Sequence, residues 1–291
     1  MKKIVLVMLS VLFLVSGNTF AQIVDESESN EELDQFYDRP INNKAKKPFV
    51  YPYVRAADVV WEHAVWRTID FREKMNQVFY YPIVPQQSRM NMYTMLDQAI
   101  SNGTIKVYND DEFKEEVDDW TKRKELMGNT TYVKVYKQDL DGFEQEEDSL
   151  VTTPMVEEDI TTLRLKERWF IDKQRSVRDV RIIGFTLVYN QQKENEGVVS
   201  SNPLEIGWVR FNDPEVRELL ANTEVYNPKN DAERRSYDDI FQKRMFTSYI
   251  TRETSTYNRK ISDYLSGMDA LYESERIEGL LFDMEQDMWE Y

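Results

Sequence analysis

Two long runs of β-branched and aromatic residues constrain the fold of this chain most strongly. Ile160–Ile171 and Arg178–Tyr189 are the longest strand candidates, and the second run is apolar at most positions after Val180. A run of this kind is typical of a central strand. A further strand is predicted at Leu204–Phe211. Because only short connections separate these three strands, we expect an antiparallel meander.

Helical patterns precede this meander. Residues 57–82 place Trp61, Val65 and Ile69 on one face of a helix, which predicts an amphipathic helix that ends near Asn76. Residues 88–102 predict a second helix, and Gly103 is suited to end it. We also expect a short strand at Ile105–Tyr108, a helix over Asp110–Met127 and a strand over Thr130–Tyr136.

Helical patterns also follow the meander. Asp213 and Pro214 are typical of a helix start, and Asn227-Pro228 predicts another. The second helix would present Tyr237, Ile240, Phe241, Met245 and Tyr249 at helical spacing, and a polar helix would continue from Ile261 to about Gly267. The predicted fold class is therefore α+β, an antiparallel β meander with packed helices before and after it.

The C-terminal residues form a further amphipathic pattern. Residues 273–291 place Ile277, Leu280, Leu281, Met284 and Met288 on one stripe among Asp and Glu side chains. An isolated helix of this length is marginally stable in water, so we expect it to dock on another surface. Leu281, Met284 and Met288 are our candidate docking residues.

The first residues predict export. A basic pair, Lys2-Lys3, precedes an apolar run from Ile4 to Val15, and small residues lead to a cleavage point after Ala21. The apolar run is shorter than the roughly 20 residues of a membrane span. We therefore expect a cleaved signal peptide, Met1–Ala21, and a mature periplasmic chain that begins at Gln22. An uncleaved anchor is the alternative.

Prolines and aromatic residues alternate between Arg39 and Tyr53. Proline donates no backbone hydrogen bond, so this segment is not a central strand. We expect an extended arm that lies on another surface, and the alternative is a solvated entry loop. Its candidate interface residues are Phe49, Tyr51 and Tyr53. The predicted domains are the arm at 22–56, a core domain at 57–270 and a docking helix at 271–291.

The charge of the chain limits its partners. A net charge of -16 argues against nucleic acid and against an anionic membrane surface. Basic residues nevertheless gather between the two longest strand candidates, and these are candidate interface residues: Lys173, Arg175, Arg178 and Arg181. Internal pairing of these residues is the alternative. The acidic segment Asp139–Asp159 carries only a fragment of a calcium loop, so we interpret it as a solvated insertion.

The residues of known catalytic motifs are scarce. The chain has no cysteine and a single histidine, His63, which excludes disulfides, cysteine nucleophiles and the usual Cys/His zinc sites. Glycine-rich phosphate loops and serine-nucleophile motifs are also missing from the sequence. We expect neither an enzyme nor a cofactor, and no metal site.

Two other functions stay open at this point. A glycan-binding module would use Trp61, Trp66, Trp169 or Trp208 as stacking platforms, and its rings would be exposed in a line on a sheet. A carboxylate-dependent hydrolase would hold two carboxylates about 5 to 10 Å apart in a cleft.

Three sequence runs resemble the GldN family, called PorN in non-gliding relatives. They are DVVWEHAVWRTIDFREKMNQVFYYP at residues 58–82, RWFIDKQRSVRDVRIIG at residues 168–184 and NDAERRSYDDIFQKRMFTSYI at residues 230–250. The family is a component of the type IX secretion and gliding-motility machinery. The resemblance implies a non-catalytic structural protein that is associated with the outer membrane from the periplasmic side. It also implies that copies of this chain form a ring with an outer-membrane lipoprotein, GldK or PorK. In this ring the chain would contact the periplasmic domain of GldM or PorM.

Overall fold

The structure is a computed structural model, and it describes residues 46–86, 89–138, 144–155, 157–195, 198–227, 229–230 and 232–287. The predicted signal peptide, the first part of the arm, residues 139–143 and Met288 therefore lie outside the described residues. Within the described part, no helix combines the length and the apolar composition that crossing a membrane requires.

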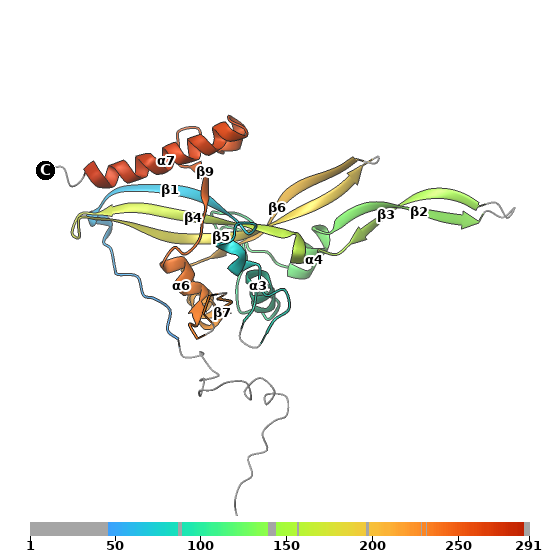
Figure 1. Ribbon diagram of the computed structural model, residues 1–291, viewed down its shortest axis with the longest axis horizontal. Coiled ribbons are helices and arrows are strands. Elements are labelled where there is room, and N and C mark those ends of the chain that lie inside the picture. Colours follow the sequence, from blue (N-terminus) through green and yellow to red (C-terminus); the bar gives the residue numbers. More distant parts are fainter. Residues whose placement is uncertain are drawn as a thin grey trace, which may run out of the picture. The chain divides into compact units, whose positions relative to one another are not determined.

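The described residues form a seven-stranded sheet with the strand order β3-β2-β5-β4-β1-β9, and β6 also pairs with β5 (Figure 1). Its strands are β1 (Val59–Asp70), β2 (Asn129–Gln138), β3 (Glu144–Thr153), β4 (Ile160–Asp172), β5 (Val177–Asn195), β6 (Val198–Arg210) and β9 (Tyr249–Glu253). Strands β4, β5 and β6 are successive antiparallel neighbours, which confirms the predicted meander. A two-stranded sheet joins β7 (Glu224–Val225) and β8 (Arg235–Ser236).

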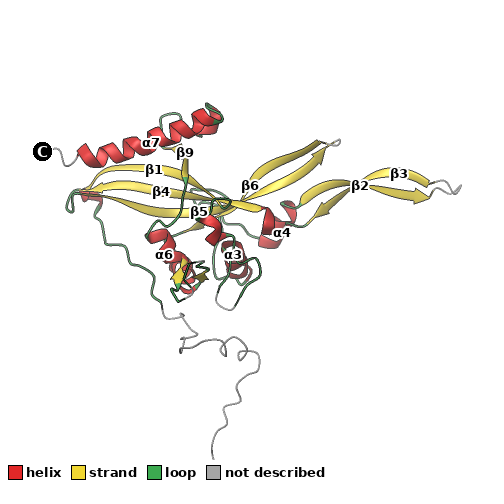
Figure 2. Cartoon of the chain, in the orientation of Figure 1, coloured by secondary structure: helices red, strands yellow, loops and turns green. Residues whose placement is uncertain are grey.

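Helices lie before and after the meander (Figure 2), which confirms the predicted α+β class. The α-helices are α3 (Met92–Ser101), α4 (Trp120–Leu126), α5 (Pro214–Asn222), α6 (Tyr237–Gln242) and α7 (Met268–Asp287). Short 3-10 helices occupy η1 (Ala56–Asp58), η2 (Asn76–Phe79), η3 (Glu157–Asp159) and η4 (Ile261–Asp263). The Asn91 side chain caps α3 by accepting a hydrogen bond from the Thr94 N–H group. Gly103 follows α3 at φ +69°, a conformation that glycine adopts readily.

The helix predicted from residue 57 to about Asn76 is wrong, because most of this stretch is strand β1. Ala64 to Ile69 are buried without interruption, since both faces of this part of the strand are covered. A strand buried on both faces loses the alternation that would distinguish it from a buried helix. The β-branched residues Val59, Val60 and Val65 are the sequence signal that favours a strand.

Four smaller predictions are also wrong in extent. Ile105–Tyr108 contributes only two isolated bridges, from Tyr108 to Glu116 and to Trp208. Residues 110–127 are helical only in α4, and η4 replaces the helix predicted from Ile261. Helix α6 ends at Gln242, because Arg244 adopts a positive φ of 50°, and Tyr249 then begins β9.

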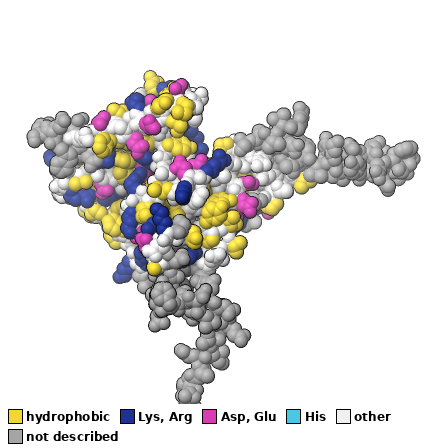
Figure 3. Space-filling model, viewed as in Figure 1, with side chains coloured by type: hydrophobic (Ala, Val, Ile, Leu, Met, Phe, Trp, Pro, Cys, Tyr) yellow, Lys and Arg dark blue, Asp and Glu magenta, His cyan; other side chains and the backbone are white. Residues whose placement is uncertain are grey.

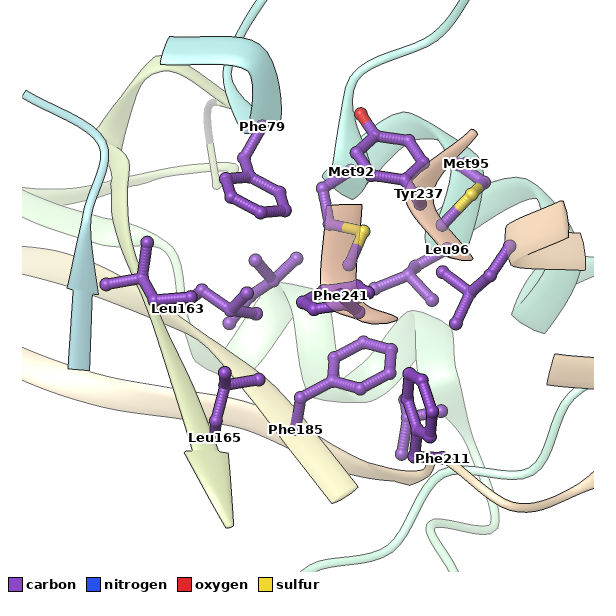
Figure 4. Close-up of a cluster of buried hydrophobic side chains, with 14 of the residues drawn as sticks. Phe79, Met92, Met95, Leu96, Leu163, Leu165, Phe185, Phe211, Tyr237 and Phe241 are labelled. Carbon is purple, nitrogen blue, oxygen red and sulfur yellow. The ribbon is translucent and has the colours of Figure 1, made fainter. Parts of the chain in front are cut away.

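The main hydrophobic core joins the sheet to α3, α5 and α6, and Figure 4 shows its side chains from the sheet, α3 and α6. Phe241 on α6 lies at its centre, with ring centroids 5.6 Å from Phe79, 6.0 Å from Phe185 and 5.7 Å from Phe211. Met92, Met95 and Leu96 of α3 complete the packing from the side of that helix. This cluster, called the aromatic core below, is the largest buried cluster among the described residues.

A second, smaller cluster holds α7 on the sheet. We call it the α7 cluster, and its buried members are Val65, Trp169, Ile250, Ile261, Ile277 and Leu281. Ser274 of α7 also accepts a hydrogen bond of 2.8 Å from the backbone N–H of Ile250 in β9. Helix α7 therefore satisfies a backbone donor of the edge strand as well as burying apolar surface. The predicted C-terminal helix is present, and it begins at Met268.

Candidate interaction surfaces

The described part of the arm, residues 46–55, is extended and is fixed to α5 and α6. The Phe49 N–H group donates to the Asp238 carboxylate at 3.0 Å, and the Phe49 carbonyl accepts from Arg217 at 2.6 Å. Lys46 adds an ion pair with Asp239 at the start of α6. Backbone groups of the arm are thus bound at specific positions, as expected for an ordered segment and not for a freely solvated loop.

The three candidate side chains of the arm differ in exposure. Tyr51 is half-buried, its ring lies 5.2 Å from the guanidinium groups of both Arg181 and Arg217, and its hydroxyl accepts a hydrogen bond from Gln242. Phe49 is 55% exposed and Tyr53 is 88% exposed. Tyr51 is therefore part of the anchor that fixes the arm, whereas Phe49 and Tyr53 stay accessible on it.

The turn between β4 and β5 carries two of the predicted basic residues. The Arg175 guanidinium lies 2.7 Å from Asp172 and 3.4 Å from Asp179. The hydrogen bond from Arg175 holds the pKa of the Asp172 carboxyl below its ordinary value, because it stabilises the ionised form. Lys173 is exposed, and among the described residues only its backbone N–H has a hydrogen-bond partner, the Asp58 carbonyl.

The other two predicted basic residues contact their own chain. Arg178 donates a hydrogen bond of 2.7 Å to the Leu281 carbonyl of α7, and its guanidinium lies 4.7 Å from the Trp169 ring. Arg181 donates to the Pro52 carbonyl of the arm. Arg175, Arg178 and Arg181 thus have partners within the described chain. A role for the four residues in an interface between proteins stays a prediction.

A charged network separates the aromatic core from the α7 cluster. Glu167 on β4 is 0% exposed and contacts Arg67 Nε at 3.2 Å and Arg244 Nη1 at 2.8 Å. The Trp169 indole N–H also donates to Glu167, and Arg67 reaches Glu278 on α7 at 3.0 Å. Two cations and an indole N–H offset the unfavourable burial of this carboxylate.

The strand register places this network between the two clusters. Val65, Arg67 and Ile69 alternate along β1 and pair with Glu167, Leu165 and Leu163 of β4. Side chains paired in this way point to the same face of an antiparallel sheet. Val65 belongs to the α7 cluster and Ile69 belongs to the aromatic core. The two clusters therefore share one sheet face, with Arg67 and Glu167 between them.

The candidate docking residues of α7 also have different environments. Leu281 is buried in the α7 cluster, Met284 is half-buried, and Met288 lies outside the described residues. Leu281 therefore docks the helix on its own chain. Apolar side chains that remain accessible lie elsewhere on α7: Met268, Leu271, Tyr272, Leu280 and Phe282. In Figure 3, hydrophobic and acidic side chains lie together on the part of the surface where α7 runs.

A cavity of about 710 Å³ lies over the opposite face of the sheet and extends to Ala270 and Leu271 at the start of α7. Trp66, Arg164, Glu205 and Trp208 are among its lining residues. Glu205 forms an ion pair with Arg164 and accepts a hydrogen bond of 2.8 Å from the Trp208 indole N–H. The cavity combines charged and apolar surface, and its central charges are paired with each other.

Carboxylates bind the indole N–H groups of several tryptophans. Trp66 donates to Asp111 at 2.9 Å and Trp120 donates to Asp97 at 2.7 Å. The rings of Trp66, Trp169 and Trp208 are buried. These tryptophans therefore support the interior and do not form the exposed line of rings that a glycan-binding sheet requires.

The histidine and the acidic segment singled out in the sequence make structural contacts over their described residues. His63 lies 3.3 Å from Glu253 and stacks on Trp61. The acidic segment forms β3 and η3 over its described residues. Among the described residues, no group of three or more His, Cys, Asp or Glu side chains is placed to hold a metal ion.

Neither the Glu167 network nor the cavity was predicted from the sequence. Glu167 and Lys166 interrupt an otherwise apolar pattern in β4, and Arg67 does the same in β1. A charged residue within a buried strand requires a partner of opposite charge, so these positions indicated buried ion pairs. Which partners they meet depends on strand order, and that order was not predictable.

Comparison with known proteins agrees with the three sequence runs. The family described as gliding motility associated protein GldN matches residues 54–290, which includes all the strands and helices described above. No curated protein matches the chain. This chain belongs to the GldN family and is a component of the gliding-motility and type IX secretion machinery.

Proposed function

We propose that the mature chain is a non-catalytic building block of a ring in the periplasm, attached to the outer membrane through a lipoprotein of the GldK or PorK type. The ring also contacts the periplasmic domain of the motor protein, GldM or PorM. Met1–Ala21 is removed as a signal peptide, so mass spectrometry of the native N-terminus finds Gln22 as the first residue. Retention of Met1–Ala21 would contradict the periplasmic assignment.

One observation supports this proposal beyond family membership. The arm holds Phe49, Val50 and Tyr53 in exposed positions on a backbone that is bound to α5 and α6. Exposed apolar side chains on an ordered segment are typical of protein interfaces. Since the segment is already ordered, less conformational entropy is lost when a partner binds. A closed ring requires such a surface, because each subunit presents two different faces to its neighbours.

Analytical ultracentrifugation of the mature chain with the soluble part of its lipoprotein partner tests the proposal. The expected result is a large assembly that Phe49→Ser with Tyr53→Ser weakens by at least tenfold in apparent Kd. The matched control, Val60→Ser, changes an exposed residue on β1 outside the arm and leaves the assembly unchanged. A wild-type mixture that stays monomeric would contradict the ring assignment.

The basic residues at the turn between β4 and β5 require a variant that changes the assembly without changing the stability of the chain. Reversal of Arg175 and Arg178 to Glu lowers thermal stability as well as assembly, because both residues bind within the chain. Lys173→Glu avoids this difficulty because the Lys173 side chain is exposed. We expect Lys173→Glu to weaken the assembly at an unchanged melting temperature, since charges at the rim of an interface influence association. Unchanged assembly would remove Lys173 from the interface.

A further inference from the structure

Helix α7 buries apolar residues on the side that faces the sheet. It also carries apolar residues on the side that faces away from the sheet. Met268, Tyr272, Gly279 and Phe282 follow one another at spacings of four, seven and three residues. Residues at such spacings fall on one side of a helix. Ile277 and Leu281, which dock the helix, lie on the opposite side. We call the first set the outer stripe.

The outer stripe is accessible over most of the helix. Met268 is 61% exposed, Tyr272 is 60% exposed and Phe282 is 53% exposed. A helix with apolar residues on both sides is normally covered on both sides. The sheet covers one side of α7, and within the described residues nothing covers the outer stripe. It therefore has the pattern of a surface that a partner covers.

Charge selects the kind of partner. The acidic residues of α7 are Asp269, Glu273, Glu275, Glu278, Asp283, Glu285 and Asp287, and its basic residue is Arg276. A symmetric contact between two copies of α7 would bring two acidic helices together, and like charges oppose such a contact. An anionic membrane surface is disfavoured for the same reason, because helices that bind it are rich in Lys and Arg. The outer stripe therefore fits a partner whose contact surface is apolar and is bordered by basic residues.

The shape of the outer stripe favours a helix as the occupant. A Cβ atom added to Gly279 would meet nothing within 4 Å. The missing side chain leaves a gap in the stripe between Tyr272 and Phe282, where the backbone of a second helix can approach closely. Glu275 and Asp283, both exposed, lie beside this gap. They lie one helical turn to either side of Gly279, where they can pair with Lys or Arg side chains on the two edges of a helix that crosses α7 at this position.

We propose that the outer stripe of α7 binds an amphipathic helix of another protein in the machinery, whose apolar face is bordered by Lys and Arg. This inference rests on the proposed function and adds the place and the chemistry of one contact. The helix crosses α7 at Gly279, with its apolar side chains between Tyr272 and Phe282. Its basic side chains pair with Glu275 and Asp283.

Site-specific photo-crosslinking in intact cells tests this contact. A photoreactive phenylalanine analogue replaces Tyr272 or Phe282 in the full chain, and Leu126, an exposed residue on α4, serves as the control position. The expected product joins α7 to a segment of a different protein that has helical apolar spacing and net positive charge. The Leu126 position does not give this product.

Two variants check the physical basis of the contact. Gly279→Leu fills the gap with a side chain that has free space, so the melting temperature of the isolated chain does not fall, while the crosslink decreases at least tenfold. Glu275→Lys with Asp283→Lys decreases the same crosslink by reversing the charge. A crosslink that persists unchanged in both variants would overturn the proposal.

The remaining outcomes separate the inference from the proposed function. A crosslink to a second copy of this chain, to lipid or to an acidic segment overturns the inference. The absence of any α7 crosslink in cells that still contain the large assembly overturns it as well and leaves the ring function standing. If the large assembly itself is missing from wild-type cells, the ring function fails and the inference fails with it.

Discussion

The aromatic core and the α7 cluster lie on one face of the same sheet and are held in different ways. The aromatic core is a continuous apolar layer in which Phe241 touches the rings of Phe79, Phe185 and Phe211 (Figure 4). The α7 cluster is much smaller and borders the buried charges of Glu167 and Arg67. Apolar burial dominates the first region, whereas the second depends to a larger extent on satisfied ionic contacts.

This difference shows how a long terminal helix is retained without disulfides. The α7 cluster offers little apolar area, so Arg67, Arg178 and Ser274 add specific bonds between the sheet and α7. Specific bonds fix the orientation of a helix but contribute less free energy than a large core does. We therefore expect α7 to separate from the sheet at a lower free energy than the aromatic core requires to unfold.

The largest effect is expected in the aromatic core. Phe241→Ala removes a fully buried ring and leaves a cavity among Phe79, Phe185 and Phe211, so unfolding becomes easier by about 3 to 5 kcal/mol. Chemical denaturation followed by tryptophan fluorescence measures this free energy. A loss below about 1 kcal/mol would mean that neighbouring rings collapse into the space, and that the core is less rigid than the ring contacts imply.

The second effect concerns the charges between the two regions. Glu167→Gln keeps the shape of the side chain but leaves Arg67 and Arg244 without their buried anion, which destabilises the chain by about 3 kcal/mol. The matched control is Glu278→Gln, which removes the other carboxylate partner of Arg67. The Glu278 side chain is 54% exposed, so this change costs less than about 1 kcal/mol. Equal losses in the two variants would show that burial does not set the strength of this network.

The third effect is confined to α7. Ile277→Ala removes a buried side chain from the α7 cluster and costs about 2 kcal/mol. Leu280→Ala changes an exposed residue of the same helix and stays within about 0.5 kcal/mol of the wild type. Hydrogen exchange locates the Ile277→Ala effect in the amides of α7. Faster exchange in β4 and β5 as well would contradict a separate opening of this helix.

The smallest effect is expected at the β4–β5 turn, which borders the Arg178 contact with α7. Arg175→Gln removes the hydrogen bond that lowers the pKa of Asp172, so this pKa rises toward its ordinary value. A lowered pKa stabilises the fold above the pKa of the unfolded chain, and this stabilisation is lost as pH falls through the folded pKa. The wild type therefore exceeds Arg175→Gln in stability at neutral pH, and the difference disappears in acid.

Titration of the Asp172 carboxyl by NMR measures this change directly. Lys173→Gln is the matched control, because the Lys173 side chain does not contact Asp172 among the described residues. An unchanged Asp172 pKa in Arg175→Gln would show that Asp179 and not Asp172 is the main partner of Arg175.

Sequence reasoning predicted the elements whose pattern is local. The β-branched runs of β4 and β5 and the capped helix α3 follow from short-range preferences, and so does the stripe of α7. Strand β1 was mistaken for a helix, because Val65, Thr68 and Ile69 also match helical spacing when both faces of a strand are buried. Tyr249 was also assigned to a helix, because it continues the four-residue spacing of Tyr237, Phe241 and Met245, although it begins β9.

The candidate surfaces were predictable in part. The aromatic composition of the arm and the basic turn indicated where to look, but not that Tyr51 and Arg181 would contact each other. The Glu167 network joins β1, β4, the segment after α6 and α7, which are distant in the sequence. Such contacts depend on tertiary pairing, and local patterns carry no information about it.

Native-state hydrogen exchange tests most directly whether the two regions differ in stability. The amides of β4, β5 and α6 should exchange only through global unfolding, and those of α7 should exchange through a separate opening of lower free energy. Urea dependence distinguishes the two routes, because a separate opening exposes less surface and has a smaller slope. Exchange of α7 at the global free energy and with the global slope would contradict this account.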